Sequence, residues 1–284
     1  MGIKLRQLLF LLCFFAALSA KAQTHHYSYY GKDFYEAWQN HKSEETLKQL
    51  LHNVLQNWHL PSNSGFDSIL ENCSQPECYH HTWQSYADAR KTLFGEIHLV
   101  QSKSDGYGVQ DVYCNRVRFE SEFKTNPPRP GKIPNPQVVN AEHTWPQSKF
   151  SSKYSKDLQK SDLHSLYSVY SRANSSRSND PFGEVATITS QVCPESKKGL
   201  SPNGSVVFEP PNNHKGNVAR ALFYFSIRYE ISIDENQEHF LRSWHQLDPV
   251  DTEEIQRNET VFLEQKNRNP FIDHPELVDS IQDF

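Results

Sequence analysis

The chain has 284 residues, a formal net charge of -5 and a charged fraction of 22%. An acidic chain has no global positive field, which excludes polyanion binding by net charge alone; a nucleic-acid site would have to be a local basic surface. Residues 1–22 have a basic start, an apolar run and small residues at the end, the pattern of a cleaved secretory signal. This segment holds three basic residues and no acid, so its removal would change the charge from -5 to -8.

The mature chain, residues 23–284, is long enough to bury a sizeable core. The apolar run of the signal is shorter than the roughly 20 residues that a membrane helix needs, and no later segment approaches that length. We therefore expect a secreted or periplasmic protein that has no membrane partner.

Four of the five cysteines remain after the signal, and four cysteines in an exported chain predict two disulfides. Cys73 and Cys78 are near enough in sequence to close a small loop, which would leave Cys114 to pair with Cys193. The other two connectivities stay open. A zinc site is the competing interpretation, but Cys-x4-Cys has no matching second pair here.

In chain order, the first half of the mature protein predicts helices followed by a hairpin. Apolar residues recur at helical spacing in the early segments, and two β-prone runs then flank Asp105-Gly106. Five prolines between residues 126 and 137 predict an extended connection, because proline breaks helices and ladders. The predicted elements are helical segments at 34–58 and 86–94, and strands at 97–100 and 109–113.

The second half predicts short strands with one helix among them, followed by three further helices. The predicted strands are 138–143, 162–166 and 206–208, and the predicted helices are 167–177, 217–229, 238–246 and 251–264. Since the chain shows no internal repeat, the simplest architecture is a mixed α+β, helix-rich single domain over residues 23–284.

The predicted strand at 138–143 ends in Glu142-His143, a carboxylate beside an imidazole. Phosphodiester hydrolysis needs an activated water and relief of the phosphate charge. An imidazole can take a proton from water near neutral pH, so His143 is the candidate general base. Glu142 and, on the predicted helix downstream, Asn174 offer oxygen ligands for Mg²⁺, and their single negative charge leaves the ion able to bind a phosphate.

Neighbouring residues on a strand point to opposite faces, so Glu142 and His143 should not both bind one ion. Separate roles fit better, with the carboxylate on the metal and the imidazole on the attacking water.

Other residues have weaker signals. His164 follows Asp162 in a predicted strand, and the pair could brace the fold or orient a loop as readily as touch substrate. A basic run precedes the Glu-His pair and is the best candidate for a local nucleic-acid surface, although an ordinary solvated loop explains it equally well. This run consists of Arg116, Arg118, Lys124, Arg129 and Lys132.

Five sequence blocks, in order, resemble the bacterial endonuclease I family, a branch of the His-Me finger (ββα-metal) nucleases. The blocks are YADARKTLF (86–94), NAEHTWPQS (140–148), DLHSLYSVYSRANSSRSN (162–179), FEPPNNHKGNVARA (208–221) and NRNPFIDHP (267–275).

The resemblance implies a secreted or periplasmic, sequence-non-specific endonuclease that cuts DNA, and often RNA, and leaves 5′-phosphate ends. It implies one Mg²⁺, which Mn²⁺ or Ca²⁺ can replace in the site, and no small-molecule cofactor. His143 would be the general base, and Glu142 and Asn174 the metal ligands. The finger would consist of the strand ending at His143, the strand around His164 and the helix with Asn174. No apolar stripe suggests self-association, so we expect a monomer.

Two departures limit the resemblance. The connection at 150–161 is short beside family members that place an arginine-bearing loop there, and Lys160 stands where some carry an acid. The group that protonates the leaving oxygen is therefore not assigned. Arg172 and Arg177 are candidates for phosphate contact, with a solvated helix face as the alternative.

The alternative function is a catalytically silent nucleic-acid-binding protein on the same fold. An exported metalloprotease is disfavoured, because the chain contains no His-Glu-x-x-His and no inverse of it.

Overall fold

The computed structural model describes residues 28–284, so the predicted secretory signal lies outside the described residues. The chain divides into two compact units, with the boundary between His81 and Thr82. The mixed α+β, helix-rich architecture expected from the sequence is confirmed, with several small antiparallel sheets. Within residues 28–284, no helix is long and apolar enough to cross a membrane.

In the part of the chain that the structure describes, the first unit includes two complete helices and a small hairpin. The helical segment predicted at 34–58 is two helices, α2 (Lys32–Gln39) and α3 (Glu44–Gln56). Helix α3 begins where the Ser43 side chain accepts a hydrogen bond from the Thr46 amide. Strands β1 (Trp58–Leu60) and β2 (Ser68–Leu70) pair antiparallel after it.

The second unit begins with α4 (Tyr86–Thr92), which continues as a π-helical turn over Leu93–Ile97. An antiparallel sheet follows, and the predicted hairpin is confirmed by its strands β3 (Leu99–Ser102) and β4 (Gly106–Asp111). Gly106 has a φ of 75°, which suits glycine at this turn. The third strand, β5 (Arg116–Phe119), was not predicted. The proline-rich segment 126–137 contains no helix or strand, as predicted.

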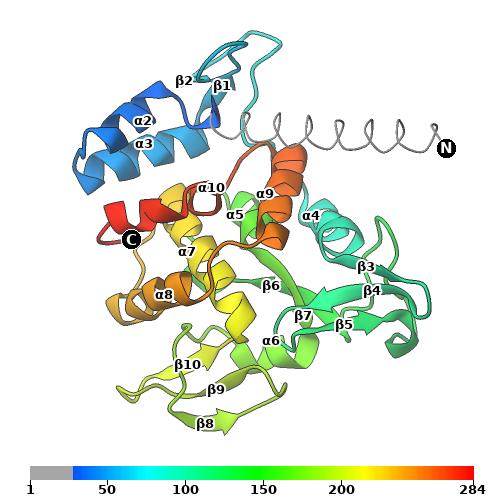
Figure 1. Ribbon diagram of the computed structural model, residues 1–284. Coiled ribbons are helices and arrows are strands. Elements are labelled where there is room, and N and C mark those ends of the chain that lie inside the picture. The colour runs from blue at the N-terminus through cyan, green and yellow to red at the C-terminus, as the bar shows by residue number, and fades with distance from the viewer. Residues whose placement is uncertain (1–27) are drawn as a thin grey trace, which may run out of the picture. The chain divides into compact units, whose positions relative to one another are not determined.

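A ββα unit lies next in the chain and consists of β6 (Val139–His143), β7 (Leu166–Tyr170) and α6 (Ser171–Arg177). Figure 1 shows β6 and β7 side by side, and their register sets His143 opposite Leu166. The short helix α5 (Lys156–Ser161) connects the two strands.

The predicted boundaries in this region are wrong. Residues 162–166 were expected to be a strand, but the Asp162 side chain accepts a hydrogen bond from the His164 amide and caps a 3-10 turn over Leu163–Ser165. The strand begins only at Leu166, where pairing with β6 starts. The predicted helix 167–177 is therefore a strand for its first four residues and a helix from Ser171.

A further sheet has the order β10-β9-β8 and consists of β8 (Thr187–Ser190), β9 (Lys197–Leu200) and β10 (Val206–Glu209). Only β10 was predicted. Gly199 in the middle strand, β9, allows β8 to approach closely, because a Cβ at this position would lie 2.0 Å from the Thr187 carbonyl oxygen.

Three long helices follow, close to their predicted bounds: α7 (Lys215–Tyr229), α8 (Glu235–Leu247) and α9 (Thr252–Gln265). Asp234 and Asp251 cap α8 and α9 through their carboxylates. The chain then forms α10 (Pro270–Asp273) and a 3-10 turn over Pro275–Ser280.

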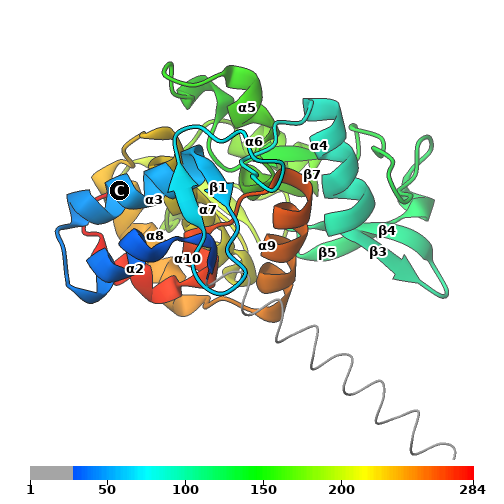
Figure 2. The ribbon, with the colours of Figure 1, turned by 90° about the horizontal axis from the view of Figure 1, so that it is seen from above.

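Figure 1 shows α7 and α8 side by side, and α7 is buried on nearly all its faces. Helix α9 lies beside α4 in both Figure 1 and Figure 2, and Val261 of α9 belongs to the same buried cluster as Ala89 of α4. Val139 and Ala141 of β6 join this cluster. One face of β6 is therefore packed against the core.

Both disulfides form with the pairing favoured from the sequence, Cys73–Cys78 and Cys114–Cys193. The first closes a loop within the first unit, and the second joins residues 79 positions apart in the second unit. The zinc interpretation of these cysteines is wrong, because each of the four is bonded to another cysteine. Disulfides are typical of proteins in oxidising compartments.

Candidate active site

His143 occupies the last position of β6 and is buried. Its ring lies against Tyr86 and Phe150, with centroid distances of 5.5 and 6.1 Å. The Nε2 atom is 3.0 Å from the Lys160 carbonyl oxygen, and Nδ1 is 3.2 Å from the Gln147 amide nitrogen. A carbonyl can only accept, so Nε2 carries the proton and donates it to Lys160; Nδ1 accepts from Gln147 and is the basic atom.

Burial lowers the pKa of His143 to about 4. The hydrogen bond to the Lys160 carbonyl opposes this effect, while the charges of Lys160 and Arg177 add to it. At neutral pH the imidazole is therefore neutral, the state that a general base requires.

The carbonyl that orients His143 belongs to the last turn of α5, and the next residues anchor that turn. Asp162 is fully buried, and its Oδ2 accepts from the hydroxyls of Tyr224 and Tyr229, each at 2.8 Å. Its Oδ1 accepts from Gln265 Nε2 at 2.8 Å. Asp162 thus ties α5 to α7 and to the end of α9, two residues after the Lys160 carbonyl.

His164 lies in the same buried network. Its Nε2 is 3.2 Å from the Asn267 carbonyl oxygen, which can only accept, and its ring packs 4.6 Å from that of Tyr224. Burial lowers the pKa of His164 to about 4, although the Asp162 charge opposes this. Asp162 and His164 therefore both contact helix α7, through Tyr224.

Glu142 points to the other face of β6 and is also buried. Its Oε1 accepts a hydrogen bond from the Tyr113 hydroxyl at 3.0 Å and pairs with Arg177 Nη1 at 3.0 Å. Burial raises the pKa of Glu142, and the Arg177 guanidinium and the Tyr113 hydroxyl lower it. Among the described residues, both contacts fall on Oε1, so Oε2 is left to meet an ion or water.

Asn174 comes from α6 and is half-buried. Its Nδ2 lies 2.7 Å from Asn140 Oδ1 and donates to it. Asn140 lies two residues before Glu142 on β6, so both side chains belong to the same face of the strand. This hydrogen bond therefore brings the Asn174 carboxamide to the face of Glu142 and leaves the Asn174 Oδ1 atom available.

These two residues suit a hard cation that keeps most of its water. They supply oxygen atoms and one negative charge, which is the ligand chemistry of Mg²⁺. Within residues 28–284, no group of three or more His, Cys, Asp or Glu side chains could hold a metal ion.

The contacts separate Glu142 from His143, as strand alternation predicted. Glu142 meets Tyr113 and Arg177, whereas His143 meets Tyr86 and lies on the face of β6 that packs into the core. The two residues are nevertheless consecutive at the end of the strand.

Arg177 does not lie on a solvated helix face. It is buried, pairs with Glu142, donates to the carbonyl oxygens of His143 and Thr144 at 3.3 and 3.0 Å, and stacks over the Phe182 ring. The alternative of a solvated helix face is therefore wrong for Arg177, and its contact with phosphate stays a prediction. Arg172, on the same helix, is exposed, and its contact with phosphate stays a prediction.

The predicted basic run is largely neutralised by its neighbours. Arg118 pairs with buried Asp111 at 2.8 Å, Arg116 pairs with Glu122 at 2.5 Å and Arg129 pairs with Glu120. The remaining members, Lys124 and Lys132, are exposed. Nucleic-acid binding by Arg116 and Lys132 stays a prediction.

Sequence reasoning missed three contributors to the site. Tyr113 contacts Glu142 from 29 residues away, and the Lys160 carbonyl contacts His143 from 17 residues away. No local pattern announces either contact. Gln147 lies four residues after His143, and its place in the NAEHTWPQS block is a signal that could have drawn attention to it.

The chain is similar in sequence to proteins that are named as nucleases. The extracellular ribonuclease of Bacillus subtilis (strain 168) is 34% identical over 160 residues, which cover 50% of this chain and 53% of that protein. Endonuclease-1 of Buchnera aphidicola subsp. Acyrthosiphon pisum is 30% identical over 112 residues, or 39% of this chain and 44% of that protein. The extracellular deoxyribonuclease of Aeromonas hydrophila is 27% identical over 119 residues, or 39% and 48%.

The chain thus spans about half the length of the relatives it matches. The family match is longer. The family model described as Endonuclease I matches residues 74–276, which is more than half of the chain and includes the whole ββα unit. The chain therefore belongs to the endonuclease I family.

Proposed function

We propose that the protein is a secreted or periplasmic, sequence-non-specific endonuclease that hydrolyses phosphodiester bonds of DNA and RNA. The observation that carries this proposal is the state of His143, a neutral imidazole whose proton is fixed on Nε2 by a backbone carbonyl. A buried histidine held in one tautomer, beside a carboxylate on the opposite face of the strand end, suits a general base.

In the proposed reaction, a water molecule takes the place of the Gln147 amide at His143 Nδ1 and gives that atom a proton, while Nε2 keeps its hydrogen bond to the Lys160 carbonyl. The water oxygen forms a bond to phosphorus, and the bond from phosphorus to the 3′ oxygen breaks. The departing 3′ oxygen takes a proton from a solvent water molecule, so the products are a 5′-phosphate end and a 3′-hydroxyl end. The Lys160 carbonyl stabilises the imidazolium that forms, because it already accepts the Nε2 proton.

Glu142 and Asn174 would hold one Mg²⁺, with Mn²⁺ or Ca²⁺ able to take its place; the ion would supply charge relief to the phosphate. Arg177 would support ion binding by favouring the charged form of Glu142. Burial alone would favour the protonated form of Glu142, and the adjacent guanidinium favours the carboxylate. Tyr113 holds the same oxygen in place.

The compartment and the substrates are inferred from two sources. Two disulfides suit an exported chain whose signal is residues 1–22 and whose mature part, 23–284, includes the nuclease domain. Relatives are named extracellular ribonuclease, extracellular deoxyribonuclease and periplasmic deoxyribonuclease, which supports both nucleic acids as substrates. We propose that the protein acts as a monomer.

The test is incubation of residues 23–284 with supercoiled plasmid and with RNA, in the presence and absence of EDTA. We expect EDTA to abolish cutting. We expect His143→Ala to lower the cutting rate by at least about 100-fold, which is the smallest rate loss typical of removing a general base. The matched control is His239→Ala, which removes an exposed histidine from α8. Full cutting by His143→Ala would overturn the role of His143. Binding without any cutting by the wild-type protein would favour the catalytically silent alternative.

A further inference from the structure

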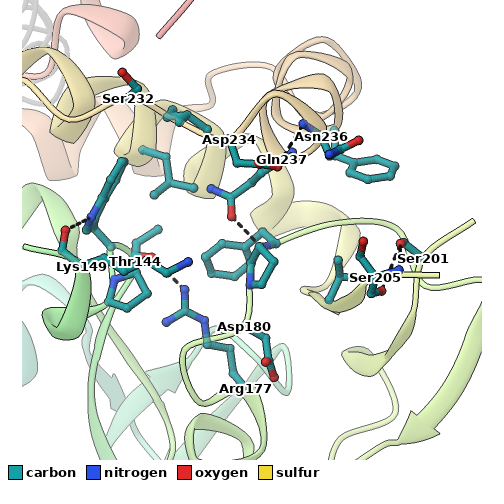
Figure 3. Close-up of a pocket in the computed structure, with 18 of the residues that line it drawn as sticks. Thr144, Lys149, Arg177, Asp180, Ser201, Ser205, Ser232, Asp234, Asn236 and Gln237 are labelled. Carbon is teal, nitrogen blue, oxygen red and sulfur yellow. Dashed lines mark hydrogen bonds between the residues drawn. The ribbon is translucent and has the colours of Figure 1, made fainter. Parts of the chain in front are cut away.

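A pocket of about 400 Å³ lies next to the candidate active site. Thr144, Trp145 and Pro146, which directly follow His143, form part of its wall. Figure 3 shows Thr144 and Lys149 on one side, Gln237 reaching from the start of α8 on another, and Arg177 below. The pocket is therefore built on the chain segment that leaves the strand end.

Arg177 connects the pocket to the site. Its guanidinium contacts Glu142 and the carbonyl oxygens of His143 and Thr144, and the residue also lines the pocket. Its buried Nε has no hydrogen-bond partner among the described residues. Arg177 therefore belongs both to the strand end and to the pocket wall.

The lining combines flat apolar surface with neutral polar groups. Phe182, Phe240 and Val207 supply the apolar part. Gln237 Oε1 accepts from the Phe182 amide at 3.1 Å, so its Nε2 remains to donate to a ligand. A pocket with apolar walls and a few placed donors is typical of small-molecule recognition.

The charges in the lining do not favour a phosphate. Arg177 is paired with Glu142 and Asp180 with Lys198, which leaves the opposite charges of Lys149 and Asp234 in the lining. A volume of about 400 Å³ lies near the lower end of the range for small-molecule pockets, roughly 300–1,000 Å³, and is too small for a duplex. The occupant that fits is one flat, neutral ring with acceptors at its edge.

We propose that this pocket binds one unstacked nucleobase of the strand that is cut beside His143. The inference rests on the proposed nuclease function and narrows its substrate to strands with accessible bases. A base can enter a pocket only when it is unpaired or flipped out of the duplex. The proposal therefore assigns to the protein a preference for single-stranded or unpaired nucleic acid over a rigid duplex.

The test scans an abasic nucleotide along a 5′-labelled single-stranded oligo(dT) and records the cutting rate at every phosphate. In the wild-type protein we expect cutting to fall about tenfold at a phosphate with a fixed offset from the abasic position, a loss typical of one base-aromatic stack. Ser205→Trp fills the pocket from its exposed rim. This variant should cut the intact oligonucleotide more slowly and lose the dip at the abasic position.

Thr187→Trp is the matched control, because it adds the same ring at an exposed position of β8, in the sheet that follows Ser205, without lining the pocket. It should keep the wild-type pattern with its dip. Should Ser205→Trp not fold by circular dichroism, Phe240→Ala replaces it, removes one ring from the pocket and should weaken the dip. A dip that persists unchanged in a folded pocket variant would place the base elsewhere and overturn the inference.

Two further outcomes separate the inference from the function on which it rests. If the wild-type protein cuts the oligonucleotide with no dip at any offset, the base pocket is refuted and the nuclease proposal stands. If it cuts neither the oligonucleotide nor plasmid, with Mg²⁺ present, the proposed function fails and the inference fails with it.

Discussion

The buried network behind the ββα unit makes a prediction about pH and stability through His164. Its imidazole is fully enclosed, and burial lowers its pKa to about 4. In the unfolded chain the same group takes up a proton below about pH 6.5. As the pH falls through this window, the unfolded state binds a proton that the folded state does not, so the free energy of unfolding decreases.

The size of the effect follows from the two pKa values. The gap between about 6.5 and about 4 corresponds to about 3 kcal/mol in total, and about 2.5 kcal/mol of this is lost by pH ~4.5. His214 is also buried, and its pKa is lowered to about 3, so it adds a loss of the same sign. The contribution of His164 is isolated by comparing the pH dependence of the unfolding free energy in the wild type and in a His164 variant.

The variant is His164→Gln, which removes the titrating group but can keep a donor toward the Asn267 carbonyl. We expect the decrease in unfolding free energy between about pH 7.5 and pH 4.5 to be about 2.5 kcal/mol smaller in His164→Gln than in the wild type. Urea unfolding at the two pH values measures it, with His239→Gln as an exposed control. Plasmid cutting at pH ~7.5 should be retained by His164→Gln.

Two results would refute this reasoning. An identical pH dependence in the wild type and His164→Gln would mean that the imidazole titrates alike in the folded and unfolded chains. A loss of cutting at pH ~7.5 in a variant with wild-type stability would give His164 a role in the reaction rather than in the buried network.

Three further predictions test the surroundings of the site. Asn140→Ala removes the hydrogen bond that orients Asn174 and should raise the Mg²⁺ concentration needed for half-maximal cutting by about 10-fold or more, measured by metal titration. Arg177→Met leaves a buried carboxylate without its cation and should lower the unfolding free energy by about 3–5 kcal/mol in urea unfolding; a loss below about 1 kcal/mol would contradict the buried pair. Replacing Cys114 and Cys193 by Ala should cost about 4 kcal/mol, since the disulfide closes a loop of 79 residues, and an unchanged melting temperature would contradict this.

The elements that were predicted from the sequence are those with strong local periodicity. Helices α7, α8 and α9 match their predictions closely because each presents a long apolar repeat to the core. Strand β8 was missed because its first three residues are exposed, so no apolar alternation marks it. Strand β5 has the alternating sequence Arg-Val-Arg-Phe, which is a strand signal that its charges obscured.

The boundary between strand and helix after Asp162 depends on tertiary contacts. The sequence Leu166–Tyr170 is compatible with either state, and pairing with β6 decides it. The burial of Arg177 has the same origin. Its helix is polar by sequence, and only the position of Glu142 on the neighbouring strand gives the guanidinium a buried partner. Residue types could thus be predicted for the site, but not the contacts that set their charge.

The candidate base illustrates how far those contacts reach. His143 donates its Nε2 proton to a carbonyl that α5 presents, and α5 is held by Asp162, whose acceptors meet α7 and the end of α9 from 62, 67 and 103 residues away. A water molecule or side chain at the same place could accept or donate, and would leave the tautomer free. A backbone carbonyl accepts only, so the fold itself selects Nδ1 as the base. A Glu-His dipeptide alone is therefore weak support for a nuclease. The reaction requires the basic lone pair of the imidazole to point in one direction. Residues outside the dipeptide set that direction.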